Sequence, residues 1–125
     1  MAPYDEHPFA FARSTAEFIP WPDETFETVV AATSLDHVYL LDRALAEIRR
    51  VLVRGGRFIL WSAVFPHTPP YDPYAEAIIP PDLYHLFHPG ENWFPAMLGQ
   101  YFRLIERIGN EPSPILSGSF FAFER

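Results

Sequence analysis

The spacing of apolar residues changes along the first half of the chain, and each spacing predicts a different element. Thr25 to Thr33 is rich in β-branched residues and is bounded by polar turns, which predicts a buried strand. The apolar positions of the next segment recur at helical spacing, at Leu41, Leu45, Ile48 and Leu52. Gly55-Gly56 is expected to end that helix. The nearly continuous apolar run from Arg57 to Phe65 then suits a parallel strand covered on both faces, so the sequence predicts a right-handed strand-helix-strand unit.

Three further elements and a strand stub are expected around this unit. Phe9 to Arg13 predicts at most a stub of strand. Asn92 to Tyr101 predicts a helix with Asn92 as its N-cap. Phe102 to Ile108 and Ser117 to Phe123 predict two last strands, because each is short, apolar and bounded by turn residues.

The segment from Pro66 to Pro95 breaks the pattern. It holds eight of the 14 prolines together with several tyrosines, phenylalanines and a tryptophan. This composition is too apolar for a linker, which indicates a structured lid or insertion. Tyr74 to Ile79 predicts a short helix in its middle.

Composition and charge narrow the classes of function. The formal net charge is -7, which disfavours nucleic acid as a partner. Cysteine is absent, which removes disulfides, thiolate catalysis and cysteine zinc sites. No apolar run approaches the roughly 18 residues of a membrane span, and the start has no signal-peptide pattern, so we expect a cytoplasmic protein without a membrane partner.

A set of motifs in order resembles the class I S-adenosylmethionine-dependent methyltransferases, in particular their small-molecule branch. The matching residues are Ala16-Glu17, Ile19-Pro20-Trp21-Pro22-Asp23, Phe26-Glu27, Val29-Val30, Leu35, His37, Ala44-Leu45, Glu47, Arg50-Val51-Leu52 and Gly55-Gly56. Tyr101-Phe102, Glu106 and the terminal apolar strand add weaker matches to the last helix and closing hairpin of the family.

The resemblance implies an α/β fold with a partial Rossmann-like methyltransferase sheet. That sheet is expected to be mostly parallel with an antiparallel last strand, and to have about four main strands and two to three helices. Residues 1–125 would form a single incomplete domain. Its parts would be a strand-helix-strand core at 15–65, a proline and aromatic lid at 66–95, and a last helix with closing strands at 96–125.

The chain departs from the family in one severe respect. The first strand of the family, its Gly-rich turn and the acid that ends its second strand hold the methionine portion and the ribose of the cofactor. The sequence contains no Gly-x-Gly, and Gly55-Gly56 follows a helix rather than a strand. We therefore expect the carboxyl-terminal part of such an enzyme, truncated and impaired or inactive alone.

The resemblance also implies site residues. Ser14, Thr15 and Ala16 would meet the adenine edge of S-adenosylmethionine. The strand end at Ala32, Thr33 and Ser34 would border the transferred methyl group. Asp36 and His37 would face a small-molecule methyl acceptor, with His37 as general base or orienting group, although a solvated loop histidine is an equally open reading.

Two other readings stay open. The first is a non-catalytic interaction module that forms homo-oligomers, because the edge of the Thr25 to Thr33 strand would lack a neighbour. The second is a metal hydrolase built on His85 and His88 with Asp82 and Glu91. The sequence argues against this second reading, because that spacing would bind a metal only on a helix and Pro89-Gly90 disrupts a helix. No metal site is therefore expected.

Overall fold

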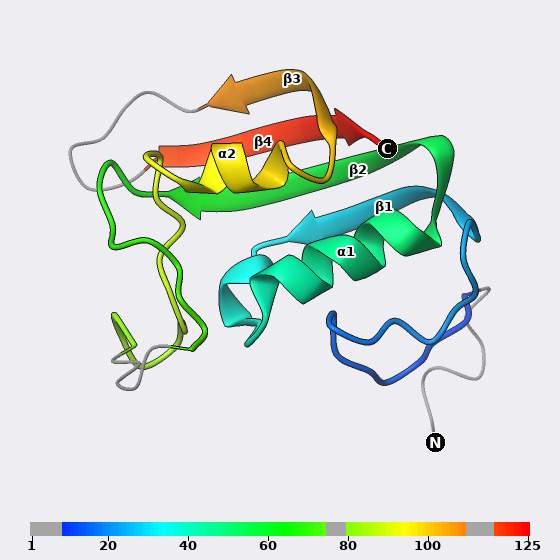
Figure 1. Ribbon diagram of the computed structural model, residues 1–125, viewed down its shortest axis with the longest axis horizontal. Helices are drawn as coiled ribbons and strands as arrows, with labels where there is room; N and C mark the ends of the chain where they lie inside the picture. Colours follow the sequence, from blue (N-terminus) through cyan, green and yellow to red (C-terminus); the bar gives the residue numbers. More distant parts are fainter. Residues whose placement is uncertain (1–8, 75–79, 110–116) are drawn as a thin grey trace.

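The computed structural model describes residues 9–74, 80–109 and 117–125. Within them the chain forms one mixed α/β domain with four strands and two α-helices (Figure 1). In chain order the elements are β1 (Phe26–Ala32), the 3-10 turn η1 (Leu35–His37), α1 (Leu41–Val51), β2 (Leu52–Val64), α2 (Phe94–Leu98), β3 (Arg103–Gly109) and β4 (Ser117–Glu124).

The four strands form one sheet in the order β1-β2-β4-β3. β1 and β2 are parallel, and β4 is antiparallel to both β2 and β3. Three strands therefore run the same way and only the last one runs against them (Figure 1). This confirms the predicted Rossmann-like sheet and its strand-helix-strand unit, in which α1 connects two parallel neighbours.

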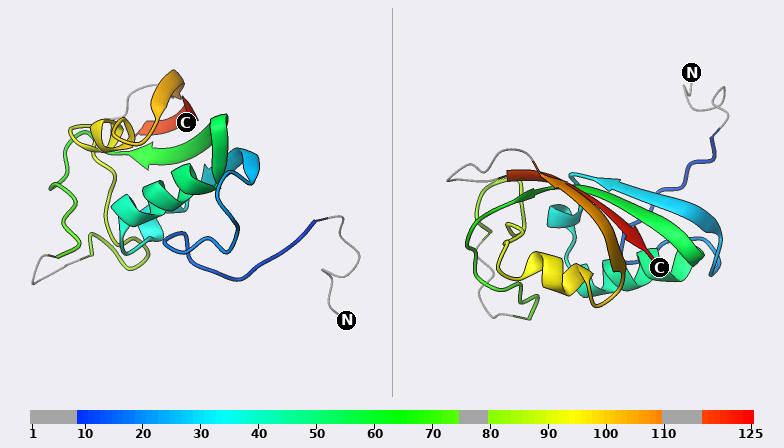
Figure 2. Two further views of the ribbon diagram at one scale, coloured as in Figure 1. Left: turned by 45° about the vertical axis from the view of Figure 1, so that its right-hand side comes forward. Right: turned by 90° about the horizontal axis from the view of Figure 1, so that it is seen from above.

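Both helices lie on the same face of the sheet (Figure 2). The sheet contributes Phe58, Leu60 and Phe121 to the core on that face, each no more than 1% exposed. α1 contributes Leu41 and Leu45, both fully buried, which is the stripe that the helical spacing predicted. Burial of each such side chain contributes about 1.5–3 kcal/mol, so this face fixes the sheet against α1.

The opposite face of the sheet carries apolar side chains that stay exposed. Val30 on β1 is 66% exposed, Ile108 on β3 is 59% exposed, and Phe120 on β4 is 51% exposed. Phe120 pairs with Ile108 on one side and with Trp61 on the other. These three apolar side chains form a row across β2, β4 and β3. No described helix covers this face (Figure 2).

The Gly-Gly pair does not end the helix as predicted. α1 ends at Val51, and Gly55 and Gly56 lie inside β2. Gly55 has a φ of 75°, a left-handed conformation that favours glycine. At Gly56 an added Cβ would lie 2.8 Å from the carbonyl oxygen of Val53 and 3.1 Å from that of Glu27. Glycine is therefore favoured at position 55 by the left-handed backbone and at position 56 by the close approach of two carbonyl oxygens.

We expect Gly56→Ala to lower the free energy of unfolding by about 1–3 kcal/mol, because both crowding atoms belong to the backbone. Urea denaturation followed by circular dichroism measures the change. Gly99→Ala is the matched control, since a Cβ there comes no nearer than 3.4 Å to any atom. Equal stability of the two variants would contradict the steric explanation.

Two of the remaining elements differ from the prediction, and a third cannot be compared with it. α2 spans only Phe94–Leu98, and its N-cap is Trp93, whereas the Asn92 amide donates to the Thr68 carbonyl oxygen at 3.1 Å. Asn92 is thus used to tie two loops together rather than to cap the helix. Phe9 to Arg13 forms no strand. The helix predicted at Tyr74 to Ile79 falls almost wholly on residues 75–79, outside the described residues.

Candidate active site

The loop after β1 turns sharply at the carboxyl end of the parallel strands. Thr33 has a φ of 50°, which is strained for a β-branched residue, and its N–H donates to the Trp61 carbonyl oxygen at 2.9 Å. Ala32, Thr33 and Ser34 are all exposed. Ligands of open α/β sheets bind at this end of the strands, which is the end where these three residues are expected to border the transferred methyl group.

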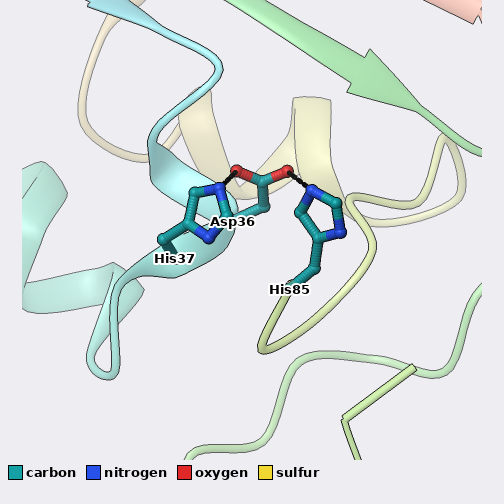
Figure 3. Close-up of side chains that lie close together, drawn as sticks. All are labelled: Asp36, His37 and His85. Atoms are coloured by element: carbon teal, nitrogen blue, oxygen red, sulfur yellow. Dashed lines mark ion pairs between the residues drawn. The ribbon is translucent and has the colours of Figure 1, made fainter. Parts of the chain in front are cut away.

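Asp36 is the centre of a cluster with two histidines (Figure 3). The Asp36 side chain is only 10% exposed; its Oδ1 lies 3.6 Å from His37 Nε2, and its Oδ2 lies 3.5 Å from His85 Nε2. The two imidazoles stack with centroids 5.0 Å apart. The backbone N–H of Leu86 also donates to the Asp36 carbonyl oxygen at 3.0 Å. The loop after β1 and the proline-rich segment thus meet at Asp36.

The cluster continues from His85 toward the end of β2. His85 Nδ1 lies 2.8 Å from Asp82 Oδ2, and His88 Nε2 lies 2.9 Å from the same oxygen. The hydrogen bond from His88 is the main cause that lowers the pKa of Asp82. His88 stacks on Phe65 with centroids 4.0 Å apart. Acids and imidazoles therefore alternate from His37 to His88 across the carboxyl ends of β1 and β2.

A cleft of about 700 Å³ opens beside this cluster. Its lining comes mainly from the predicted lid, with Val38 and Tyr39 from the loop before α1. The lid residues that line it are His67, Thr68, Pro69, Pro70, Tyr71, Asp72, Pro73, Pro80, Pro81, Leu86, Phe87 and His88. Tyr71 anchors the lid, because its hydroxyl accepts from the Leu41 N–H at 2.9 Å and donates to the Tyr39 carbonyl oxygen. The volume and the apolar lining suit a small organic molecule.

Glu17 holds the Ser14 to Ala16 segment near the same loop. Its carboxylate accepts from the backbone N–H of Tyr39 at 2.7 Å and from that of Leu40 at 3.2 Å. Burial raises the pKa of Glu17, but the backbone hydrogen bonds outweigh it and the pKa is lowered. Ser14 and Thr15 stay exposed, while Ala16 packs partly against the core. The Ser14 to Ala16 segment is therefore attached, through Glu17, to the loop that follows the other predicted cofactor segment at Ala32 to Ser34.

Arg50 and Glu47 of α1 clamp the segment that enters β1. The Arg50 guanidinium donates to the carbonyl oxygens of Trp21 at 2.8 Å and Ile19 at 2.9 Å, and to Asp23 Oδ1 at 2.8 Å. Glu47 accepts from Arg50 Nε at 2.7 Å and from the Ile19 N–H at 2.9 Å. Glu47 and Arg50, two of the matched motif residues, thus hold the segment that enters β1 against α1. Arg50 is therefore not a solvated side chain at the end of the helix.

This clamp makes stability depend on pH. The hydrogen bond from Arg50 is the main cause that lowers the pKa of Glu47 from 4.5 to about 2. A carboxyl whose pKa is depressed by folding stabilises the fold above its unfolded pKa and ceases to do so as the pH falls through its folded pKa. We expect the free energy of unfolding to fall between about pH 4.5 and 2, and Glu47→Gln to flatten that part of the profile in urea titrations. An unchanged slope in the variant would contradict the assignment.

The structure brings some predicted residues together and separates others. Asp36, His37, His85, Asp82 and His88 form one cluster. Glu91 does not join it, because both of its carboxylate oxygens accept from Arg107 at 2.6 Å. Sequence reasoning missed the contact between Asp36 and His85, since no local signal links residues so far apart. It also missed the role of Glu17, although the Ala16-Glu17 motif pointed to that position.

Comparisons with known proteins show similarity to methyltransferases. A family profile described as "Methyltransferase domain" matches residues 2–60. A ubiquinone/menaquinone biosynthesis C-methyltransferase of Bordetella avium is 43% identical over 68 residues, which cover 52% of this chain and 27% of that protein. Its counterpart in Cellvibrio japonicus is 36% identical over 75 residues, which cover 57% of this chain and 30% of that protein.

Over about half of its length, the chain is thus similar to methyltransferases. Among solved structures, the YcgJ protein of Bacillus subtilis matches 92% of this chain with a TM-score of 0.68 and 17% identity, over 70% of its own length. The [4+2]-cyclase SpnF matches 92% with a TM-score of 0.73 and 16% identity, over 55% of its length. At these identities the likeness shows the fold alone, and the cyclase shows that one fold hosts more than one reaction.

The chain spans about 30% of the length of the curated methyltransferase that it matches in Cellvibrio japonicus. Among the residues that the structure describes, no helix has the length and apolar character needed to cross a membrane.

Proposed function

We propose that this chain forms the acceptor-facing and adenine-facing part of an enzyme that transfers a methyl group from S-adenosylmethionine to a small molecule. The observation that carries the proposal is the position of the exposed strand end at Ala32 to Ser34 beside the Asp36 cluster, within a sheet of the methyltransferase family. A cytoplasmic location belongs to the same proposal.

The residues of the chain fit one end of the cofactor. Exposed Thr15 and Ser14 offer hydroxyl groups to an adenine edge, and Thr33 and Ser34 offer hydroxyl groups beside a sulfonium centre. No Gly-x-Gly turn occurs in the sequence to receive the methionine end. We therefore propose weak cofactor binding and impaired activity for this chain alone.

The proposed chemistry is an in-line transfer in which positioning dominates. Bound S-adenosylmethionine would supply an electrophilic methyl group on its sulfur. The cleft would hold the apolar or aromatic part of the acceptor, because its walls are mainly proline, tyrosine and phenylalanine. His37, which is half-exposed and backed by buried Asp36, would orient the acceptor and take its proton.

Calorimetric titration with S-adenosylmethionine tests this proposal on two proteins. One is the chain itself, and the other is a chimera in which the chain follows the part of the Bordetella avium relative that precedes the matched region. We expect weak binding by the chain and much tighter binding by the chimera, because the added part is expected to supply the Gly-rich turn of the family. Absence of binding by both proteins would overturn the proposal.

A second candidate function is self-association through the open side of the sheet. Among the described strands, β1 has a neighbour on one side only, and Val30 on it is 66% exposed. Unpaired strand edges with apolar side chains associate readily with another strand. Light scattering should then show a dimer that Val30→Lys dissociates and Arg49→Lys leaves intact. A stable monomer at all concentrations would rule this candidate out.

A further inference from the structure

The distances from the Asp36 oxygens to the histidine nitrogens are longer than hydrogen bonds, whereas those from the Asp82 oxygens are not. Asp36 Oδ1 lies 3.6 Å from His37 Nε2, and Oδ2 lies 3.5 Å from His85 Nε2. Hydrogen bonds between nitrogen and oxygen are about 2.7–3.2 Å long, so neither contact is a direct hydrogen bond. Two atoms that bind one tetrahedral Zn²⁺, each at about 2.0–2.1 Å, lie roughly 3.3 Å apart. The side chains of Asp36, His37 and His85 are therefore spaced as the ligands of one ion rather than as a hydrogen-bonded chain.

A second observation points to a missing partner at the same place. The Asp36 side chain is 10% exposed, and its Oδ1 is buried with no hydrogen-bond partner among the described residues. Buried carboxylate oxygens are costly to leave unpaired, and such an exception calls for an explanation by an ion or a proton. Figure 3 shows the two imidazoles directing ring nitrogens at the two oxygens of this carboxylate.

The surroundings of His85 prepare it to bind a metal. Its Nδ1 lies 2.9 Å from Asp82 Oδ1 and 2.8 Å from Asp82 Oδ2. A neutral imidazole that donates Nδ1–H to a carboxylate leaves the lone pair on Nε2 free for a cation. This carboxylate-histidine-metal arrangement is usual for histidine ligands, and it fixes the ring orientation. His85 Nε2 is the atom that faces Asp36.

We propose that Asp36, His37 and His85 form a binding site for a divalent transition metal ion. Two histidines and one carboxylate are typical ligands of Zn²⁺, which is the ion proposed here. One ligand atom from each residue lies within 4.8 Å of the others, so small side-chain rotations bring all three onto one ion. Two histidines and one carboxylate leave a fourth position for water or for an oxygen of a bound molecule. The ion would fasten the lid segment at His85 to the loop after β1.

The neighbouring group of Asp82, His85 and His88 is not the proposed site. Its contacts of 2.8 and 2.9 Å are hydrogen bonds that already satisfy these atoms. The spacing of Asp82, His85, His88 and Glu91 predicted no metal site, because it would hold an ion only on a helix. The site proposed here needs no helix at 82–88, since Asp36 and His37 come from the turn after β1.

Calorimetric titration of Zn²⁺ into the chain, purified without a polyhistidine tag, tests the proposal. We expect one ion per chain. His37→Ala, at a half-exposed position that tolerates truncation, should weaken binding by more than about 100-fold, beyond the effect of losing an outer partner. Asp82→Asn should weaken it about 10- to 100-fold. His67→Ala is the matched control, because His67 lines the cleft outside the cluster, and it should leave the affinity unchanged.

Circular dichroism of the metal-free variants separates loss of binding from loss of folding, and Co²⁺ absorption spectra report the tetrahedral ligand field. No Zn²⁺ binding, or equal affinity in the chain and in a folded His37→Ala, would overturn the site. Loss of binding in His88→Ala with full binding in His37→Ala would also overturn it, because the ion would then belong to Asp82. The metal titration needs neither cofactor nor acceptor, so its outcome is distinguishable from that of the proposed methyl transfer. With the ion bound, His37 would have no free lone pair for the acceptor's proton, and a water in the fourth position of the ion would take that proton instead.

Discussion

Arg50→Ala is expected to lower the free energy of unfolding by about 2–4 kcal/mol, more than other changes on the surface of α1. The guanidinium binds Glu47, Asp23 and the carbonyl oxygens of Ile19 and Trp21. Its removal leaves the Glu47 carboxylate, only 16% exposed, without its main partner. Loss of one member of a partly buried charged pair costs more than the pair contributes, because the remaining charge stays desolvated.

Urea denaturation of the purified chain measures this change. Arg49→Ala is the matched control, because Arg49 is the exposed neighbour on the same helix and should alter stability by no more than about 0.5 kcal/mol. Similar losses in both variants would mean that helix propensity or net charge, and not the clamp, sets the stability. Retention of the full Arg50 effect at pH 2, where Glu47 is about half protonated in the folded chain and almost fully protonated in the unfolded chain, would also contradict the pairing.

Asp36→Asn is expected to lower the rate of methyl transfer by about 10²- to 10⁴-fold in the chimera that carries a Gly-rich turn. The amide carries no negative charge, whereas the two oxygens of the buried carboxylate lie 3.6 Å from His37 Nε2 and 3.5 Å from His85 Nε2. A proton transferred to His37 would therefore lose its counter-charge in the variant. Transfer of a radiolabelled methyl group from S-adenosylmethionine to a panel of small apolar and aromatic acceptors measures the rate.

Glu106→Gln is the control for that loss, since Glu106 is exposed on β3, away from the cluster. The His67→Ala variant separates a cleft effect from a cluster effect. An unchanged rate of methyl transfer in Asp36→Asn, or an equal loss of rate in Glu106→Gln, would show that Asp36 has no role in the reaction.

Local sequence signals predicted most of the fold. The β-branched run gave β1, and the helical spacing of Leu41, Leu45 and Ile48 gave α1, because each pattern reflects a face that must be buried. The error at Gly55-Gly56 arose because a glycine pair after a helix is also what a turn inside a strand requires. α2 was predicted too long because the Asn92 side chain binds another loop.

The site was less accessible from the sequence than the fold. Asp36 and His37 were found because they follow a predicted strand in a family motif. His85 and His88 were found by their spacing, but they were grouped with Glu91, which pairs with Arg107 instead. The contact of His85 with Asp36 depends on how the lid folds over the sheet, and proline-rich segments carry no periodic signal that sets such a path.

Nuclear magnetic resonance of the ¹⁵N-labelled chain, titrated with S-adenosylmethionine, is the most direct test of the proposed cofactor site, because it detects weak binding and locates it. We expect shifts concentrated at the amides of Thr15, Ala16, Thr33 and Ser34, with a dissociation constant on the order of 1 mM, since only one end of the cofactor is held. Shifts confined to other residues, or none at saturating cofactor, would contradict the assignment of this strand end as part of a methyltransferase site.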